Sequence, residues 1–206
     1  MAKPRVTLKD VAIKVGVHSS TVSRVLNPVT KDMVTKEIAN KILSAVTEMG
    51  YRPNTFAQSL KTNRSYTVGV MVPDLSNPAF ALIIKGIDNF LESHGYSVMV
   101  ANSYNLENKQ KSTLNKFRER HVDGLIIATA KRKEALINDC IREGTPFVQA
   151  VRTSNISGVC SVVSDELIGG DMVISHLAQL GHKKIAYIAG PQFFSTGFES
   201  VSCIYF

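Results

Sequence analysis

The chain has 206 residues, of which 44% are hydrophobic and 20% charged, and its formal net charge is +7. This composition is typical of a folded globular protein and excludes wholesale disorder. The three cysteines are odd in number and lack Cys-x-x-Cys spacing, so they support neither a disulfide framework nor a zinc cluster. The first ten residues lack the apolar core of a signal peptide, and the longest apolar runs are too short to span a bilayer. We therefore expect a soluble cytoplasmic protein with no metal and no cofactor.

The positive charge is concentrated near the N-terminus. Residues 1–64 contain eleven Lys or Arg and four Asp or Glu, whereas residues 65–206 contain thirteen of each kind. A basic segment joined to a neutral one indicates two separate tasks, with a polyanion as the partner of the first. Charge alone leaves three alternatives open: a nucleic acid, an acidic protein, or a basic face that is merely solvated.

The first fifty residues have the pattern of three helices separated by turns. The first is predicted over 8–15, where apolar residues recur at helical spacing after a capping box formed by Thr7 and Asp10. The second is predicted over 19–26. The third is predicted to follow Thr35, whose hydroxyl we expect to cap it.

Two short helices across a glycine-containing turn, braced by a third, form a helix-turn-helix. In that motif the second helix lies in the major groove of DNA, and polar residues at its start reach the base edges. Arg24 is the strongest candidate here, since its guanidinium can bind guanine or a phosphate with two hydrogen bonds. The same helix supplies further candidates: His18, Ser19, Ser20, Thr21 and Ser23. The alternative is an ordinary surface helix with solvated polar side chains.

The run VTLKDVAIKVGVHSSTVSRVLN, followed by YRPNTFAQSL, resembles the DNA-binding headpiece of lactose-repressor-type bacterial transcription regulators. The resemblance implies that Ser19, Ser20 and Arg24 read the major groove. It also implies that four residues bind phosphates or brace the motif: Thr7, Thr21, Ser23 and Asn27. Many members have serine where this chain has His18, whose imidazole can instead cap the helix or contact a phosphate.

Residues 54–61 form a separate short element. Asn54 can cap a helix here, but a helix of this length is unstable alone in water. The resemblance implies that it is the hinge helix, which folds on DNA beside its twin from a second subunit. Its implied DNA contacts are Asn54, Ala57 and Leu60, the last inserted between base pairs in the minor groove. Without the resemblance, the segment has the composition of a plain linker.

From residue 66 the pattern changes to alternating strands and helices. Strands are predicted at 67–72, 96–101, 124–128, 147–150, 159–163 and 184–189, and helices at 78–94, 109–119, 133–142 and 169–180. Such alternation indicates an α/β fold with a parallel sheet covered on both faces. We expect Phe80 and Phe90 to face that sheet. The dinucleotide, nucleoside-triphosphatase and hydrolase motifs are all missing from the sequence, so we expect no enzyme.

Small ligands bind such sheets outside the carboxyl ends of the strands. The residues that follow successive predicted strands are Asp74, Asn77 and Phe80, then Thr129, then Val151 and Arg152, and then Asp165. A carboxylate, an amide and an aromatic ring together suit a sugar. Other interpretations stay open, because Asp74 and Asn77 also suit a turn and a helix cap, and Phe80 also suits the core.

Three further stretches, VGVMVPDLSNPAF, VDGLII and HLAQLGHKKIAYIAGP, resemble the effector-binding domain of the same regulators, which is related to periplasmic sugar-binding proteins. The resemblance implies that five residues contact an effector, a sugar or sugar phosphate: Asp74, Asn77, Phe80, Thr129 and Asp165. Two positions depart from the family pattern. Val151 stands where many members have aspartate, and Ser200 stands where a pocket arginine is common.

The predicted organisation is a headpiece with its hinge over 1–64, a first sensor lobe over 65–182, and the start of a second lobe over 183–206. The resemblance implies a second lobe that these last residues would only begin. From the change of character after Phe198 we expect a truncated or frameshifted product, and a genuine short isoform stays open as the alternative.

The leading hypothesis is a sequence-specific transcription regulator, usually a repressor in this family, that binds a palindromic operator as a homodimer under the control of a small effector. The alternative is a truncated fragment that binds DNA without responding to an effector. A third hypothesis is a small-molecule-binding protein or enzyme that acts without DNA. The missing export signal and missing catalytic motifs argue against it.

Overall fold

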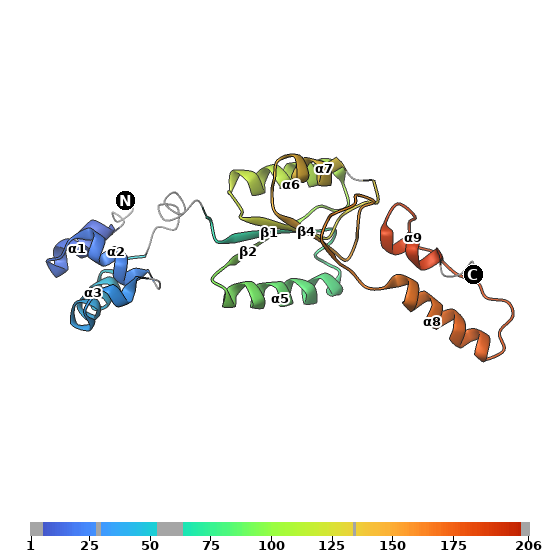
Figure 1. Cartoon of the computed structure of the whole chain (residues 1–206), viewed down its shortest axis with the longest axis horizontal. Coiled ribbons are helices and arrows are strands. Elements are labelled where there is room, and N and C mark those ends of the chain that lie inside the picture. The colour runs from blue at the N-terminus through green and yellow to red at the C-terminus, as the bar shows by residue number, and fades with distance from the viewer. Residues whose placement is uncertain (1–5, 28–29, 53–63, 134, 203–206) are drawn as a thin grey trace. The chain divides into compact units, whose positions relative to one another are not determined.

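The computed structural model describes residues 6–27, 30–52, 64–133 and 135–202. The chain divides into two compact units, an N-terminal unit, Met1–Lys61, and a C-terminal unit, Thr62–Phe206. Figure 1 shows that the first consists of helices and that the second is built around a sheet.

The N-terminal unit contains α1 (Leu8–Val15), α2 (Ser19–Leu26), a short 3-10 helix (Lys31–Met33) and α3 (Lys36–Met49). The predicted capping box is confirmed: the Thr7 hydroxyl oxygen accepts from Asp10 N at 3.3 Å, and Asp10 Oδ2 accepts from Thr7 N at 2.8 Å. Gly16 ends α1 with a φ of 75°, a left-handed conformation that glycine adopts without steric cost. The three predicted helices are therefore present.

One core joins the three helices. Its buried members come in pairs from each helix: Val11 and Ala12 from α1, Val22 and Val25 from α2, and Ile42 and Ala45 from α3. Helices of eight residues do not persist alone in water, so this shared burial stabilises α1 and α2. The prediction that the Thr35 hydroxyl caps α3 is wrong. Thr35 occupies the N-cap position, but its exposed side chain makes no capping hydrogen bond, and water can bond to the first-turn N–H groups instead.

The C-terminal unit has a five-stranded parallel sheet in the order β2-β1-β3-β4-β5. Its strands are β1 (Thr67–Val72), β2 (Ser97–Asn102), β3 (Gly124–Ile127), β4 (Phe147–Ala150) and β5 (Ser161–Val162). Its helices are α5 (Pro78–Ser93), α6 (Glu107–Glu119), α7 (Ala135–Arg142), α8 (Glu166–Gln179) and α9 (Ser195–Ser202). The parallel pairing places the carboxyl ends of all five strands at one edge of the sheet.

Helices cover both faces of the sheet. Figure 1 shows α5 on one side and α6 and α7 on the other. Phe80 of α5 packs with Val70 and Val72 of β1 on the first side, while Phe117 of α6 and Ile137 of α7 pack against the second. The predicted α/β fold class is confirmed, because strands buried on both faces require cover on both faces.

Two predictions about elements in this unit are wrong, and one helix was missed. Phe90 does not face the sheet: it is 65% exposed, on the outer side of α5, where its ring contacts His94. The strand predicted at 184–189 is not formed, because a strand needs a hydrogen-bonding neighbour and these residues pair with none of the described strands. Ile188 is 97% exposed as a result. The helix α9 was not predicted at all.

The start of the sheet is held by one carboxylate. Asp123, just before β3, accepts from Ser65 N at 2.7 Å, from Ser65 Oγ at 2.9 Å and from Tyr66 N at 3.0 Å. These bonds tie the chain entering β1 to the neighbouring strand.

A pair of glycine substitutions tests the tight packing of β1. A Cβ at Gly69 would lie 2.9 Å from Leu125 Cδ2 and 2.9 Å from Phe117 Cδ2, both buried, whereas a Cβ at Gly86 of α5 would meet no atom within 4 Å. We expect Gly69→Ala to lower the free energy of unfolding by about 1–3 kcal/mol through overpacking. Gly86→Ala should raise it by about 0.5–1 kcal/mol, because alanine favours a helix interior. Urea unfolding of both variants measures the difference, and a loss of stability in both would contradict the packing argument.

The capping box should make the stability of the N-terminal unit depend on pH. Hydrogen bonds from the Thr7 backbone and hydroxyl hold the pKa of Asp10 below its ordinary value. The carboxylate therefore stabilises the folded state above the ordinary aspartate pKa of about 3.9, and this contribution is lost as the pH falls through the lower, folded-state value. Asp10→Asn should remove this part of the pH dependence. Urea unfolding followed through the NMR signals of the Val22 methyl groups, from neutral to acidic pH, measures it. Parallel pH profiles for both proteins would refute the assignment.

Candidate nucleic-acid interface and effector edge

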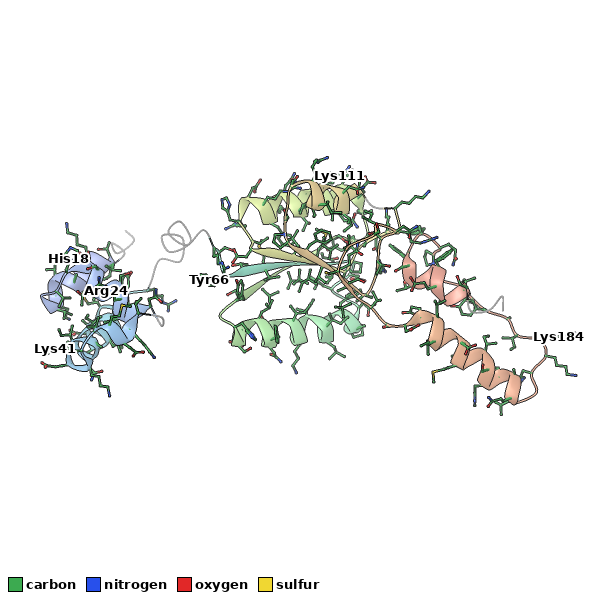
Figure 2. All side chains as sticks on the ribbon, viewed as in Figure 1. His18, Arg24, Lys41, Tyr66, Lys111 and Lys184 are labelled. Carbon is green, nitrogen blue, oxygen red and sulfur yellow. The ribbon has the colours of Figure 1, made fainter. Side chains whose placement is uncertain are left out.

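One face of α2 is polar and open to solvent. Val22 and Val25 turn inward to the core, so the intervening positions face outward at helical spacing. The exposed candidates are His18, Ser20, Ser23 and Arg24, while Ser19 and Thr21 are half-buried at the edge of the core. Figure 2 shows His18 and Arg24 among the side chains of this unit.

The first turn of α2 is capped by a histidine. His18 Nδ1 accepts from Ser20 N at 3.2 Å and lies 2.8 Å from Ser20 Oγ. With Nδ1 accepting, the neutral imidazole carries its proton on Nε2, where it can donate to an external acceptor. The expected alternative role of His18 as a helix cap is confirmed.

Arg24 is an exposed positive charge at the outer face of α2. Lys14 pairs with Glu48 at 2.6 Å, and Lys41 pairs with Glu37 at 2.8 Å, so part of the positive charge of this unit is neutralised internally. Arg24 has no ion pair with any residue in the described ranges. An exposed guanidinium among hydroxyls and an imidazole can bind phosphates and base edges.

The other predicted DNA contacts differ in their placement. Thr7 is exposed, and its hydroxyl donates to Asp10 Oδ2 at 2.7 Å. Asn27 is half-buried directly after α2, where its N–H donates to Arg24 O at 3.3 Å. The three hinge candidates, Asn54, Ala57 and Leu60, lie outside the described residues.

At the carboxyl edge of the sheet, three predicted effector residues have local structural roles. Asp74 Oδ1 accepts from Ser76 N at 2.9 Å and from Ser76 Oγ at 2.8 Å, and these bonds lower the pKa of Asp74. Asn77 Oδ1 caps α5 through Ala79 N at 3.0 Å. Asp165 Oδ1 likewise caps α8. These bonds confirm the turn interpretation of Asp74 and the helix-cap interpretation of Asn77 that the sequence left open.

The other two predicted effector residues are buried. Phe80 is 6% exposed and belongs to the core between α5 and β1. Thr129 is 1% exposed, and its hydroxyl donates to Met71 Sδ at 3.6 Å. Both side chains lie beneath the surface of the edge.

Two arginines lie at this edge: Arg152, which the sequence analysis placed after the fourth predicted strand without assigning it an effector contact, and Arg132, which it did not name. The guanidinium carbon of Arg152, after β4, is 3.7 Å from the ring centroid of Phe194, and that of Arg132, after β3, is 3.4 Å from the centroid of Phe198. Arg152 Nη1 also donates to Asn105 Oδ1, after β2, at 2.9 Å. A usable signal was present in the sequence, since Phe194 and Phe198 are four residues apart and lie on one helical face.

Backbone bonds attach α9 to the same edge. Thr153 N donates to the buried Ser195 Oγ at 2.9 Å, and Arg132 N donates to Phe193 O at 3.0 Å. The loops after β3 and β4 are therefore joined to the start of α9 by hydrogen bonds as well as by the two stacked arginines.

Two other kinds of site are missing from the part of the chain that the structure describes. None of its helices is both long and apolar enough to cross a membrane. None of its His, Cys, Asp and Glu side chains gather in threes in a way that could hold a metal ion.

Two family models match the chain. The model of bacterial regulatory proteins of the lacI family matches residues 7–54. The model of periplasmic binding proteins and the sugar-binding domain of the LacI family matches residues 65–202, more than half of the chain.

Two curated relatives are similar to most of the chain. The HTH-type transcriptional regulator RegA of Clostridium saccharobutylicum is 36% identical over 183 residues, which are 88% of this chain and 54% of that protein. The ribose operon repressor of Escherichia coli K12 is 31% identical over 187 residues, which are 90% of this chain and 56% of that protein. The chain therefore spans about half the length of these relatives.

Solved structures agree with the family models. The lac repressor dimer bound to operator and the anti-inducer ONPF superposes with a TM-score of 0.84 at 26% identity, covering 98% of this chain and 61% of that chain. The complex of the transcriptional regulator CelR with cellobiose gives a TM-score of 0.59 at 29% identity, covering 97% and 60%. With a helix-turn-helix matched at one end and a sugar-binding domain along most of the rest, this chain belongs to the LacI family of bacterial regulatory proteins.

Proposed function

We propose that the protein is a sequence-specific DNA-binding transcription regulator, a repressor controlled by a small sugar-like effector. The observation that carries this proposal is the exposed polar face of α2 on a helix-turn-helix of the LacI family, where Arg24 forms no ion pair with any described residue. The similarity to a lac repressor bound to its operator supports the same role. These relatives are regulators rather than enzymes, and we assign no catalysis to the chain.

The proposed mode of binding places α2 in the major groove. Ser19, Ser20 and Arg24 then read base edges, with Arg24 providing most of the discrimination because a bidentate guanidinium distinguishes guanine better than a hydroxyl does. The remaining contacts bind phosphates and fix the register without reading sequence: Thr7, His18, Thr21, Ser23 and Asn27. In the hinge, Asn54, Ala57 and Leu60 are proposed to contact the minor groove.

The proposed regulator acts as a homodimer on a palindromic operator in the cytoplasm. Two linked headpieces bind far more tightly than one, because the second contact forms at high effective concentration. An effector that binds the C-terminal unit then alters how the paired headpieces reach the two half-sites.

The carboxyl edge of the sheet is the proposed effector site. Asp74 and Asn77 use only Oδ1 in their local bonds, which leaves Asp74 Oδ2 and Asn77 Nδ2 for sugar hydroxyls. Asp165 likewise uses only Oδ1 to cap α8. Phe80 and Thr129 lie beneath these groups, so their direct contact with a ligand requires a rearrangement of the edge.

Replacement of Arg24 tests the DNA-binding proposal. Arg24→Ala should weaken binding to the cognate operator by about 1–3 kcal/mol for each half-site, because it removes a bidentate contact. Lys41→Ala is the matched control, since Lys41 is an exposed base of the same unit that is already paired with Glu37. Fluorescence anisotropy against a DNA site selected from a random pool, at several salt concentrations, measures both effects.

Unchanged recognition by Arg24→Ala would contradict the proposed reading of DNA by α2. Equal losses in the Arg24 and Lys41 variants would attribute binding to net charge instead. Failure of the wild-type chain to form a salt-dependent, sequence-specific complex would refute the proposal as a whole.

A further inference from the structure

One hydroxyl on α2 differs from its neighbours. The helix carries four hydroxyl side chains that are candidates for DNA contact: Ser19, Ser20, Thr21 and Ser23. Within the described part of the chain, only the Ser20 hydroxyl has a hydrogen-bond partner, the imidazole of His18, with Oγ 2.8 Å from Nδ1. Both residues are exposed on the face that is proposed to meet DNA. The direction of this bond decides what Ser20 offers to a base.

The backbone of α2 fixes that direction. Ser20 N donates to His18 Nδ1 at 3.2 Å, and a backbone N–H can only donate, so Nδ1 carries no proton. A ring nitrogen in this state offers a lone pair and no hydrogen. The 2.8 Å contact between Ser20 Oγ and Nδ1 is therefore an O–H···N bond in which the hydroxyl is the donor.

A serine hydroxyl whose proton is held in this way can only accept from a third group. A free hydroxyl donates or accepts equally well, and for this reason it discriminates poorly among bases. In the major groove, adenine and cytosine present amino groups at N6 and N4, whereas guanine and thymine present carbonyl oxygens at O6 and O4. An oxygen that only accepts bonds to the amino group and finds no donor on the carbonyl.

We propose that His18 makes Ser20 a reader of amino-bearing bases, so that adenine or cytosine is selected at one position of each operator half-site. His18 acts here through Ser20 and is a positioning residue, in addition to its proposed contact with a phosphate. The N-cap bond from Ser20 N keeps the imidazole against the first turn of α2, where Nδ1 can orient the hydroxyl. This inference rests on the proposed function, because it names the class of base that one residue of α2 recognises.

Operator selection with the full chain locates the position concerned. It is the base pair whose preference disappears in Ser20→Ala. Transitions at that pair, adenine to guanine or cytosine to thymine, exchange an amino group for a carbonyl and keep a purine or a pyrimidine in place. At about pH 8, where histidine is neutral, the amino base should bind about fivefold to thirtyfold more tightly for a change in one half-site. Fluorescence anisotropy with the two DNAs measures this ratio, and a ratio of one or a preference for the carbonyl base overturns the inference.

Two substitutions separate the two ring nitrogens of His18. In His18→Asn, Oδ1 lies two bonds from Cβ, as Nδ1 does, so it can still accept from the Ser20 hydroxyl, and asparagine is also a strong N-cap. The amino-to-carbonyl ratio should stay within about twofold of the wild-type value. In His18→Gln the amide lies one bond further out, so the ratio should fall to within about twofold of one. A wild-type ratio in His18→Gln, or its loss in His18→Asn, counts against the assignment.

A double-mutant cycle shows whether His18 acts through Ser20. His18→Gln should change the ratio when Ser20 is present and leave it unchanged in the Ser20→Ala background, where no hydroxyl remains to be oriented. An equal change in both backgrounds would mean that His18 reads the base directly, which refutes the proposed coupling. Thermal unfolding shows whether each variant is folded at the assay temperature. A weakened cap lowers affinity for both DNAs alike and leaves their ratio unaltered.

Ser23→Ala is the matched control. Its hydroxyl is exposed on the same helix and has no hydrogen-bond partner among the described residues. Because Ser23 is proposed to contact a phosphate, this variant should bind both DNAs more weakly by the same factor, with the amino-to-carbonyl ratio retained. Loss of the ratio in Ser23→Ala as well would show that any change on this face removes the preference, and the inference would then be wrong.

The same measurements distinguish this inference from the proposed function. A sequence-specific, salt-dependent complex without an amino preference at the Ser20 position overturns only the role given to His18 and Ser20. Absence of any sequence-specific complex overturns the proposed DNA-binding role and this inference with it.

Discussion

The packing of Val22 and Val25 against α1 and α3 is the interaction on which the N-terminal unit depends. Helices of eight residues are too short to persist alone, so α2 exists because its apolar side is buried in a shared core. That same burial determines which side chains remain outside. His18 and Arg24 are exposed because helical geometry separates them from the two valines, and the proposed reading of DNA follows from this division.

In the C-terminal unit, the parallel pairing of the strands determines which side chains lie close together. It brings residues from separate parts of the chain, such as Asn105 and Arg152, to one edge of the sheet. Polar groups at that edge stabilise a turn, as Asp74 does, or cap a helix, as Asp165 does, and these local roles use only part of their hydrogen-bonding capacity. Arg152 is different: no turn or helix cap uses its guanidinium, and a strained turn holds it in a half-buried position.

Much of the fold was predictable because its signals are local. The capping box at Thr7, the helix-breaking Gly16 and the alternation of strands with helices all act over a few residues. The errors arose where a distant partner decides the outcome. Residues 182–190 have a strand-like composition but find no neighbour among the described strands, and Phe90 lies on an apolar helix at a position that turns away from the sheet. The candidate effector residues were identified by their order after the strands, which says nothing about burial, so Phe80 and Thr129 were selected although both are covered.

The sequence by itself determined the two-part organisation, the polar face of α2, the parallel α/β sheet and membership of the LacI family, because periodicity, caps and motif spacing are properties of contiguous residues. Only the tertiary structure decided that Arg152 has no ion pair with a described carboxylate, that Val151 is in a strained turn, and that Phe194 and Phe198 support two guanidinium groups. The two arginine–phenylalanine contacts join segments about forty residues or more apart in the chain, and they exist only once the sheet has formed.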